Sequence, residues 1–130
     1  LYSVLKKNNK KLDAFISASA VGIYGAVNGE EICTEDMPPA NDFLGYTCQK
    51  WEDSLDFIEN LNSRTVMIRT GLVLGKNEGF LKKLTPLFKY RLGSALGSGK
   101  QYMPWIHVDD LCAIYYQAIV DPAMSGIMQQ

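Results

Sequence analysis

The sequence has no excess of charge of either sign, no long apolar run and few cysteines or histidines. Thirteen Lys and Arg residues stand against fourteen Asp and Glu residues, a formal net charge of −1. This balance argues against a general binder of nucleic acid or other polyanions. No uninterrupted apolar run approaches the roughly 18 residues of a membrane span, and no charged, apolar and small-residue leader opens the chain. We therefore expect no nucleic-acid or membrane partner, and a cytoplasmic protein.

The three cysteines, Cys33, Cys48 and Cys112, show no Cys-x-x-Cys spacing, and His107 is the single histidine. An odd, scattered set of cysteines indicates neither a disulfide framework nor a zinc site. His107 precedes a predicted helix in "WIHVDD", so a structural or substrate-lining role is favoured over metal ligation. We expect no metal site and a reducing environment.

Two segments could contact phosphate groups. The basic cluster "KKNNKK" runs from Lys6 to Lys11, and a solvated helix end is its favoured interpretation. The segment "GSALGSGKQ" misses the P-loop pattern, because its glycines are one residue too far apart and Gln101 stands in place of Ser or Thr. Nucleoside-triphosphate hydrolysis is therefore not expected.

The composition is that of one globular domain, with 130 residues, 47% hydrophobic and 21% charged. Short apolar runs predict buried strands at Asp13–Ser17 and Thr65–Arg69. The other predicted elements are helices at residues 1–11, 43–60, 80–91 and 110–120, and the opening of a strand in "GIMQQ". Apolar strands that alternate with helices predict an α/β fold with a parallel sheet covered on both faces.

The helix caps and a loop between these elements are also predicted. Asn41 or Asp42 should cap the second helix and Asp109 the last one, and residues 71–75 should form a glycine-marked loop. Leu1 stands in a helix already in progress and the chain stops in a strand, so we expect it to be part of a longer protein.

A tyrosine stands four residues ahead of a lysine in "YTCQK", residues 46–50. A rotation of about 100° per residue puts Tyr46 and Lys50 nearly opposite the predicted core stripe. That stripe contains Leu44, Cys48, Trp51, Leu55 and Ile58. A nearby ammonium lowers the tyrosine pKa from about 10 towards the range useful in acid–base catalysis. An exposed tyrosine beside a solvated lysine is the alternative. The same spacing in "YSVLK" lies ahead of the first strand, where it cannot belong to the same site.

Two serines, Ser17 and Ser19, are predicted at the end of the first strand. Ligand sites of open α/β sheets lie at this end of the strands, and a serine there can donate a hydrogen bond to a substrate carbonyl or oxyanion. A structural serine is the alternative. Arg69, the lone charge on an apolar strand, is favoured as a member of a buried ion pair over a site residue.

The ordered motifs "SASAVGIYG", "YTCQKWE", "RTGLVLG" and "PWIHVDD" resemble the active-site half of extended short-chain dehydrogenases/reductases. The group is the NAD(P)-dependent epimerase/dehydratases, and the resemblance is closest to an atypical subgroup labelled sugar-nucleotide epimerase or cell-division-inhibitor-like. It covers nearly the whole chain. It implies the C-terminal half of a Rossmann-like doubly wound sheet plus a small substrate-binding region. Residues 1–75 would be the active-site half, 76–104 the substrate-binding segment, and 105–130 a closing helix and the start of a strand.

The resemblance implies NAD or NADP as cofactor and a small-molecule substrate. Tyr46 would be the general acid–base, Lys50 its ribose-binding partner, and Ser19 the group that polarises the carbonyl, with Ser17 as second candidate. The implied cofactor-binding residues are Ser17, Lys50, Thr70, Gly71, Leu72 and Val73. The implied substrate-binding residues are Gln101, Trp105 and His107.

The chain departs from the family pattern in its dinucleotide-binding motif. The glycine-rich G-x-G-x-x-G fingerprint that binds the dinucleotide is absent from these residues. We predict an NAD(P)-dependent oxidoreductase or epimerase acting on a small carbonyl or nucleotide-sugar-like substrate, inactive as an isolated fragment. The alternative is a catalytically silent Rossmann-fold module that senses nucleotides or associates with itself, as a homodimer, through the face of Tyr46, Lys50 and Phe57.

Overall fold

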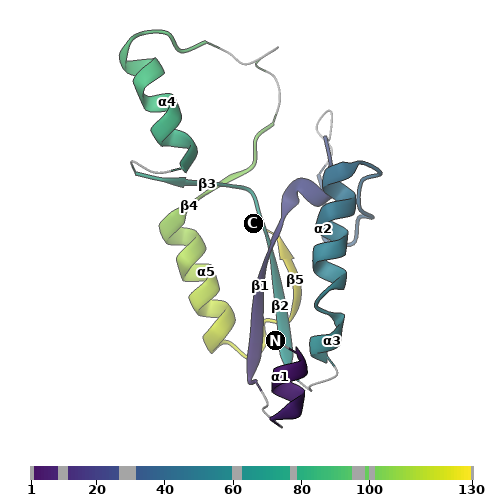
Figure 1. Cartoon of the computed structure of the whole chain (residues 1–130). Coiled ribbons are helices and arrows are strands. Elements are labelled where there is room, and N and C mark those ends of the chain that lie inside the picture. Colours follow the sequence, from purple (N-terminus) through teal and green to yellow (C-terminus); the bar gives the residue numbers. More distant parts are fainter. Residues whose placement is uncertain are drawn as a thin grey trace.

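A parallel sheet of three strands organises the molecule (Figure 1). The computed structural model describes residues 2–8, 12–26, 32–59, 63–76, 79–94, 99 and 102–129. The strands β1 (Ala14–Ala20), β2 (Arg64–Thr70) and β5 (Gly126–Gln129) lie in the order β1-β2-β5, all parallel. The predicted parallel sheet is therefore confirmed. β1 continues through Ala20 instead of ending at Ser17, so Ser19 lies inside the strand.

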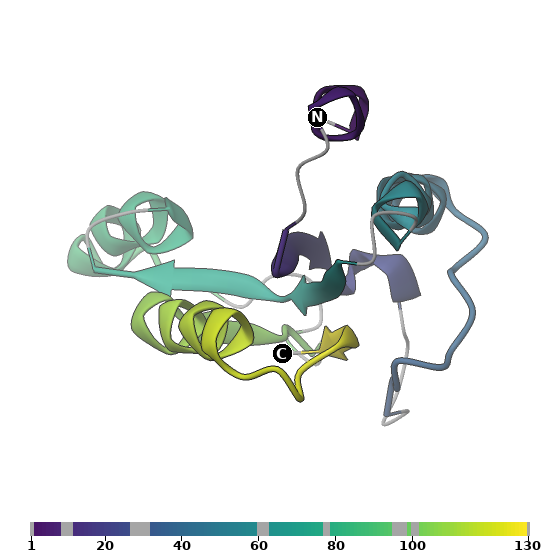
Figure 2. The same ribbon diagram turned by 90° about the horizontal axis from the view of Figure 1, so that it is seen from below.

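Helices cover both faces of this sheet (Figure 2). The helices α2 (Phe43–Asp53) and α3 (Asp56–Glu59) lie on one face, and α5 (Val108–Val120) lies on the other. A short N-terminal helix, α1 (Tyr2–Lys7), precedes β1. Apolar side chains of β2 and α5 fill the space between the sheet and α5, with Val66, Ile68 and Ala118 fully buried. A second cluster joins α2 to the one-turn helix η1 (Val21–Tyr24).

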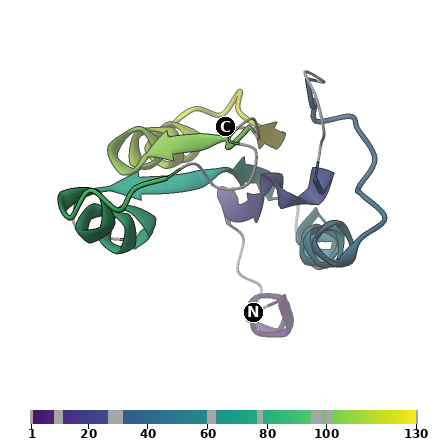
Figure 3. The ribbon, with the colours of Figure 1, turned by 90° about the horizontal axis from the view of Figure 1, so that it is seen from above.

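A small second sheet extends from the end of β2. The strands β3 (Leu72–Gly75) and β4 (Trp105–His107) pair in parallel, and α4 (Gly79–Lys89), with Pro86 inside it, packs against β3. Figure 3 shows α4 and α2 at opposite ends of the molecule. The predicted loop at residues 71–75 is wrong, because a four-residue strand is stabilised here by a partner far along the chain, with Leu72 opposite Trp105.

Two of the predicted helices differ from the observed ones in continuity or in their cap. The predicted helix 43–60 is divided into α2 and α3 by a turn at residues 54–55. Asp42 does cap α2, because its Oδ1 accepts a hydrogen bond of 2.7 Å from Gly45 N. The last helix begins at Val108, and its cap is His107, whose Nδ1 accepts from Asp109 N at 3.2 Å. Within the described ranges, no helix combines the length and the hydrophobicity that a membrane span requires.

Candidate functional site

Polar side chains cross the sheet in one row close to the carboxyl ends of its strands. The register places Ser19 of β1 beside Arg69 of β2, and Arg69 beside Gln129 of β5. From these ends the chain leaves β1 towards α2 and leaves β2 towards β3 on the other side (Figure 1). Divergence at the carboxyl ends of parallel strands is where open α/β sheets bind ligands. This edge is therefore the candidate site.

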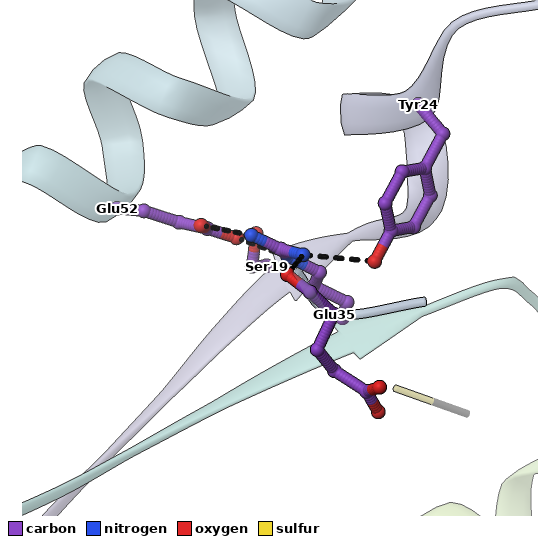
Figure 4. A network of polar contacts seen from close by, with 5 residues as sticks. Ser19, Tyr24, Glu35 and Glu52 are labelled. Carbon is purple, nitrogen blue, oxygen red and sulfur yellow. Dashed lines mark hydrogen bonds and ion pairs between the residues drawn. The ribbon is translucent and has the colours of Figure 1, made fainter. Parts of the chain in front are cut away.

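The centre of the site is a buried ion pair between Arg69 and Glu52 of α2 (Figure 4). Arg69 Nε donates to Glu52 Oε1 at 2.9 Å, and Arg69 Nη2 donates to Glu52 Oε2 at 2.8 Å. The two residues are only 4% and 8% exposed. Two parallel bonds between a guanidinium and a carboxylate fix both position and orientation. The prediction that Arg69 belongs to a buried ion pair is confirmed.

Ser19 is joined to the same carboxylate. Its Oγ donates to Glu52 Oε1 at 2.5 Å, and its side chain is buried. A serine hydroxyl has one hydrogen to donate. Here that hydrogen is donated to Glu52, so Ser19 Oγ can only accept a hydrogen bond from a ligand.

Arg69 also holds the loop that follows β1. Its Nη1 donates to the hydroxyl of Tyr24 at 2.8 Å and to the backbone carbonyl of Glu35 at 3.1 Å. The carboxylate of Glu35 in turn accepts from the backbone N–H of Gln129 at 3.1 Å. Gln129 Nε2 donates to the carbonyl of Cys33 at 2.9 Å. These bonds tie the loop residues 33–35 to the ends of β2 and β5.

The electrostatics keep the ion pair charged. Burial by itself raises the pKa of Glu52, but the hydrogen bonds from Arg69 and Ser19, with the Arg69 charge, outweigh it and lower the pKa below the ordinary glutamate value. The bonds to Glu52 raise the pKa of Arg69 against the opposing effect of burial. Burial, followed by the Glu52 charge, raises the pKa of the neighbouring Cys48 thiol. Cys48 is therefore a protonated core thiol and not a nucleophile.

Close backbone contacts seat α2 beside this pair. Ala40 N donates to the carbonyl of Ile23 at 2.8 Å, which joins the approach of α2 to η1. A Cβ on Gly45 would overlap the carbonyl oxygen of Ala40, so the first turn requires glycine. Glu52 is thereby brought over the row of Ser19 and Arg69.

The predicted core stripe of the second helix is partly wrong. Cys48, Leu55 and Ile58 are buried, but Leu44 and Trp51 are 56% and 47% exposed. The buried side of α2 instead contains Gly45, Cys48 and Glu52. Hydrophobicity alone assigned Trp51 to the core. The observed rotation brings the charge of Glu52 inside, where Arg69 and Ser19 satisfy it.

Tyr46 and Lys50 lie on the outer side of α2. Lys50 Nζ is 5.7 Å from the centre of the Tyr46 ring and 3.4 Å from Asp53 Oδ2, and the Tyr46 side chain is 59% exposed. The structure thus brings Tyr46 and Lys50 together as their spacing predicts. It does not bring them together with Ser19, which bonds to Glu52 on the buried side. The side chain of Phe57 lies outside the described residues.

The other predicted site residues fall at the junction of the two sheets. Thr70 ends β2 beside Ala20, and Gly71 links it to Leu72 and Val73 of β3. The close passage of Pro104 explains the glycine, because Leu72 N donates to the Pro104 carbonyl at 2.9 Å and a Cβ on Gly71 would lie 2.7 Å from that oxygen.

The predicted substrate-binding residues have separate surroundings. Trp105 is 62% exposed on β4, next to Leu72. His107 caps α5 and lies 3.6 Å from the carboxylate of Asp109. Gln101 lies outside the described residues, and Ser17, on β1, points its hydroxyl to the Ala18 carbonyl at 3.1 Å. In the described part of the chain, no group of three His, Cys, Asp or Glu residues could hold a metal ion.

Sequence reasoning missed Glu52, Tyr24 and Glu35. A signal for Glu52 was present, since a lone arginine on a buried strand requires an anionic partner and Glu52 stands one turn after Cys48 on the same helix. The Tyr24 hydroxyl and the Glu35 backbone carbonyl give no such signal, because only the folded loop brings them to Arg69.

The chain has known relatives along almost its whole length. The model of the NAD dependent epimerase/dehydratase family matches residues 1–127. A chloroplastic homologue of the epimerase family protein SDR39U1 from Arabidopsis thaliana is 38% identical over 125 residues, which cover 93% of this chain and 35% of the relative. The chain thus spans about a third of that relative.

Two solved structures share the fold over 90% of this chain. The nucleoside-diphosphate sugar epimerase of Corynebacterium glutamicum has a TM-score of 0.82 and 41% identity, over 90% of this chain and 25% of that one. Human SDR39U1 (isoform 2), solved with NADPH, has a TM-score of 0.79 and 30% identity, over 90% of this chain and 39% of that one.

Proposed function

The chain belongs to the NAD dependent epimerase/dehydratase family, and from that premise we propose that the full-length protein is an NAD(P)-dependent oxidoreductase or epimerase. Its substrate would be a small carbonyl compound or a nucleotide sugar. The observation that carries the proposal is the family match over residues 1–127. The NADPH bound in the human structure and the sugar epimerase from C. glutamicum support the cofactor and substrate class.

The architecture is consistent with this activity. Parallel strands end in a row of polar groups at the edge where α/β sheets bind nucleotides and substrates. Thr70, Gly71 and the start of β3 would lie next to the nicotinamide ring, and Trp105 would lie next to the substrate. Gln101 and His107 are the other proposed substrate-binding residues. A homodimer and a cytoplasmic location stay predictions.

The proposed acid–base chemistry belongs to Tyr46 and Lys50, with Ser19 or Ser17 polarising the substrate carbonyl. Tyr46 is accessible, and the Lys50 ammonium stands over its ring. Polarisation by Ser19 requires that its hydrogen turn from Glu52 to the substrate, since the hydroxyl is committed to that carboxylate.

A second candidate function has a specific observation in its favour. Tyr46 and Lys50 lie on the outer side of α2, whereas Ser19 and Glu52 lie on its buried side. A Rossmann-fold module that binds nucleotide without turnover, or associates through the outer side of α2, needs no convergence of these groups.

The test is Tyr46→Phe in the full-length protein, with Tyr90→Phe as the matched control because Tyr90 is an exposed tyrosine next to α4. NADH and NADPH would be assayed with a panel of small carbonyls and nucleoside-diphosphate sugars. If Tyr46 is the acid–base, its loss should lower kcat by about a hundredfold and leave the cofactor Kd unchanged. Tyr90→Phe should change neither.

Two other outcomes have definite meanings. Turnover that survives in Tyr46→Phe would remove Tyr46 and Lys50 from the mechanism while the enzyme proposal stands. Cofactor binding without turnover of any substrate in the wild type, together with a changed oligomeric state in Tyr46→Phe, would establish the second function.

A further inference from the structure

Arg69 donates hydrogen bonds to segments that are far apart in the chain; Figure 4 labels the partners Glu52, Tyr24 and Glu35. Its guanidinium reaches Glu52 on α2, Tyr24 on η1 and the Glu35 carbonyl in the following loop. Through Glu52 it also reaches Ser19. Each of these partners lies at the carboxyl edge of the sheet, where the candidate site is. Arg69 therefore links β2 to α2, to η1 and to the loop that contains Glu35 at this edge of the sheet.

A second arginine on the same strand shows a purely structural arrangement. Arg64, at the opposite end of β2, donates to the carbonyls of Ala118 and Met124 at 2.8 and 2.7 Å and to that of Ile119 at 3.1 Å. These acceptors belong to the end of α5 and the turn after it. Arg64 thus closes a helix end remote from the site, and it provides a matched control for Arg69.

A buried ion pair can fix the position of its neighbours without adding much to the stability of the fold. The cost of removing two charges from water offsets most of their attraction, so replacing a buried ion pair with apolar side chains often leaves stability unchanged. What apolar replacements cannot reproduce is the planar, bidentate geometry and the further donor that holds Tyr24 and Glu35. The distinctive effect of the pair is therefore on the arrangement of its neighbours.

We propose that Glu52 and Arg69 are positioning residues of the site, which hold the Ser19 hydroxyl, Tyr24 and loop residues 33–35 in the geometry that a substrate meets. This inference rests on the proposed function, because the site that the pair arranges is the proposed catalytic one. Neither residue need touch the substrate. Glu52 holds Ser19 Oγ in place by accepting its hydrogen, and Arg69 holds the Tyr24 hydroxyl and the Glu35 carbonyl.

The experiment compares three variants of the full-length protein. The double variant Glu52→Leu/Arg69→Met removes both charges together, so that neither is left buried alone. Arg69→Lys keeps the charge, but its single ammonium cannot form the fork to Glu52 and the bond to Tyr24 at once. Arg64→Met is the control at the other end of β2.

Thermal unfolding and amide hydrogen exchange are measured first, because they do not depend on activity. The double variant should stay folded, and exchange at residues 19–24 and 33–36 should rise by about tenfold or more as these segments open more often. Arg69→Lys should show the same local increase. Arg64→Met should raise exchange near the end of α5 and leave residues 19–24 at the wild-type rate.

Turnover is the second readout. The two site variants should lose about tenfold or more in kcat, since misplaced groups cost rate, with the cofactor Kd retained. Unchanged exchange at residues 19–24 and 33–36 in the folded double variant would overturn the positioning role, as would full rescue of exchange and kcat by Arg69→Lys. A wild type with no turnover would defeat the proposed function instead, and the exchange comparison would still decide the role of the pair.

Discussion

Glu52 and Asp53 are neighbours in sequence with opposite surroundings. Glu52 is buried against Arg69 and Ser19, whereas Asp53 is exposed and lies 3.4 Å from the Lys50 ammonium. An exposed pair of this kind contributes little to stability, because solvent screens it. Removing one partner of a buried pair leaves the other charge uncompensated. The two carboxylates should therefore respond very differently to neutralisation.

Glu52→Gln should destabilise the full-length protein at neutral pH by about 3 kcal/mol, because Arg69 is left buried without its counter-charge. The folded-state pKa of Glu52 is lowered, so its contribution is fully present above the unfolded pKa of about 4.3 and is lost as pH falls through the lower folded value. Urea unfolding from pH 7 to pH 3 should show a shallower acid loss of stability in Glu52→Gln than in the wild type.

Asp53→Asn is the control for this measurement, since it also removes one carboxylate from the last turn of α2. It should shift the free energy of unfolding at pH 7 by less than about 1 kcal/mol. Equal effects of the two variants would show that the buried bonds of Glu52 do not stabilise the folded state.

At the scale of elements, α2 is held by the approach of its first turn to residues 40–42. Glycine is normally a weak residue inside a helix, and replacing it with alanine favours the helix by about 1 kcal/mol. At Gly45 the added methyl would overlap the backbone carbonyl of Ala40. The tertiary contact and the helix propensity therefore act in opposite directions at this residue.

Gly45→Ala should destabilise the full-length protein by about 2 kcal/mol, because overpacking against the backbone outweighs the gain in propensity. Gly22→Ala is the control in the adjacent η1, where a Cβ would lie 3.9 Å from Cys48 Sγ in ordinary contact. It should change stability by less than about 1 kcal/mol. Chemical denaturation measures both, and a stabilised Gly45→Ala would mean that α2 can shift away from Ala40 without cost.

At the scale of the whole molecule, the chain holds one part of a family fold. It spans 35% of the A. thaliana relative and 39% of the human structure. The candidate site has polar strand ends, but the 130 residues contain no G-x-G-x-x-G turn to bind a pyrophosphate at a helix N-terminus. Cofactor affinity should therefore depend on the rest of the full-length protein.

Residues 1–130 alone should bind NADH and NADPH at least about a hundredfold more weakly than the full-length protein, because the pyrophosphate contacts are missing. Calorimetric titration of both proteins measures the difference, and circular dichroism verifies that the shorter chain is folded. A folded fragment that binds either dinucleotide as tightly as the full-length protein would contradict this division.

Elements whose signals are local could be predicted from the sequence alone. Continuous apolar runs and helical periodicity are read from neighbouring residues. The α/β class, two parallel strands (predicted at residues 13–17 and 65–69, observed at 14–20 and 64–70) and a cap at residue 41 or 42 were therefore predictable. The lone charge of Arg69 on an apolar strand also predicted a buried ion pair, because an isolated charge cannot stay unpaired in a core.

Which side chains meet depends on how the elements pack. Glu52 and Arg69 are 17 residues apart, and Ser19 and Glu52 are 33 apart. Contacts between residues so far apart depend on how α2 is rotated on the sheet. The sequence of one helix does not predict this rotation when aromatic and charged residues are both candidates for its buried side. For the same reason β3 and β4 escaped prediction, since a strand of three or four residues is stabilised by its distant partner and not by its own composition.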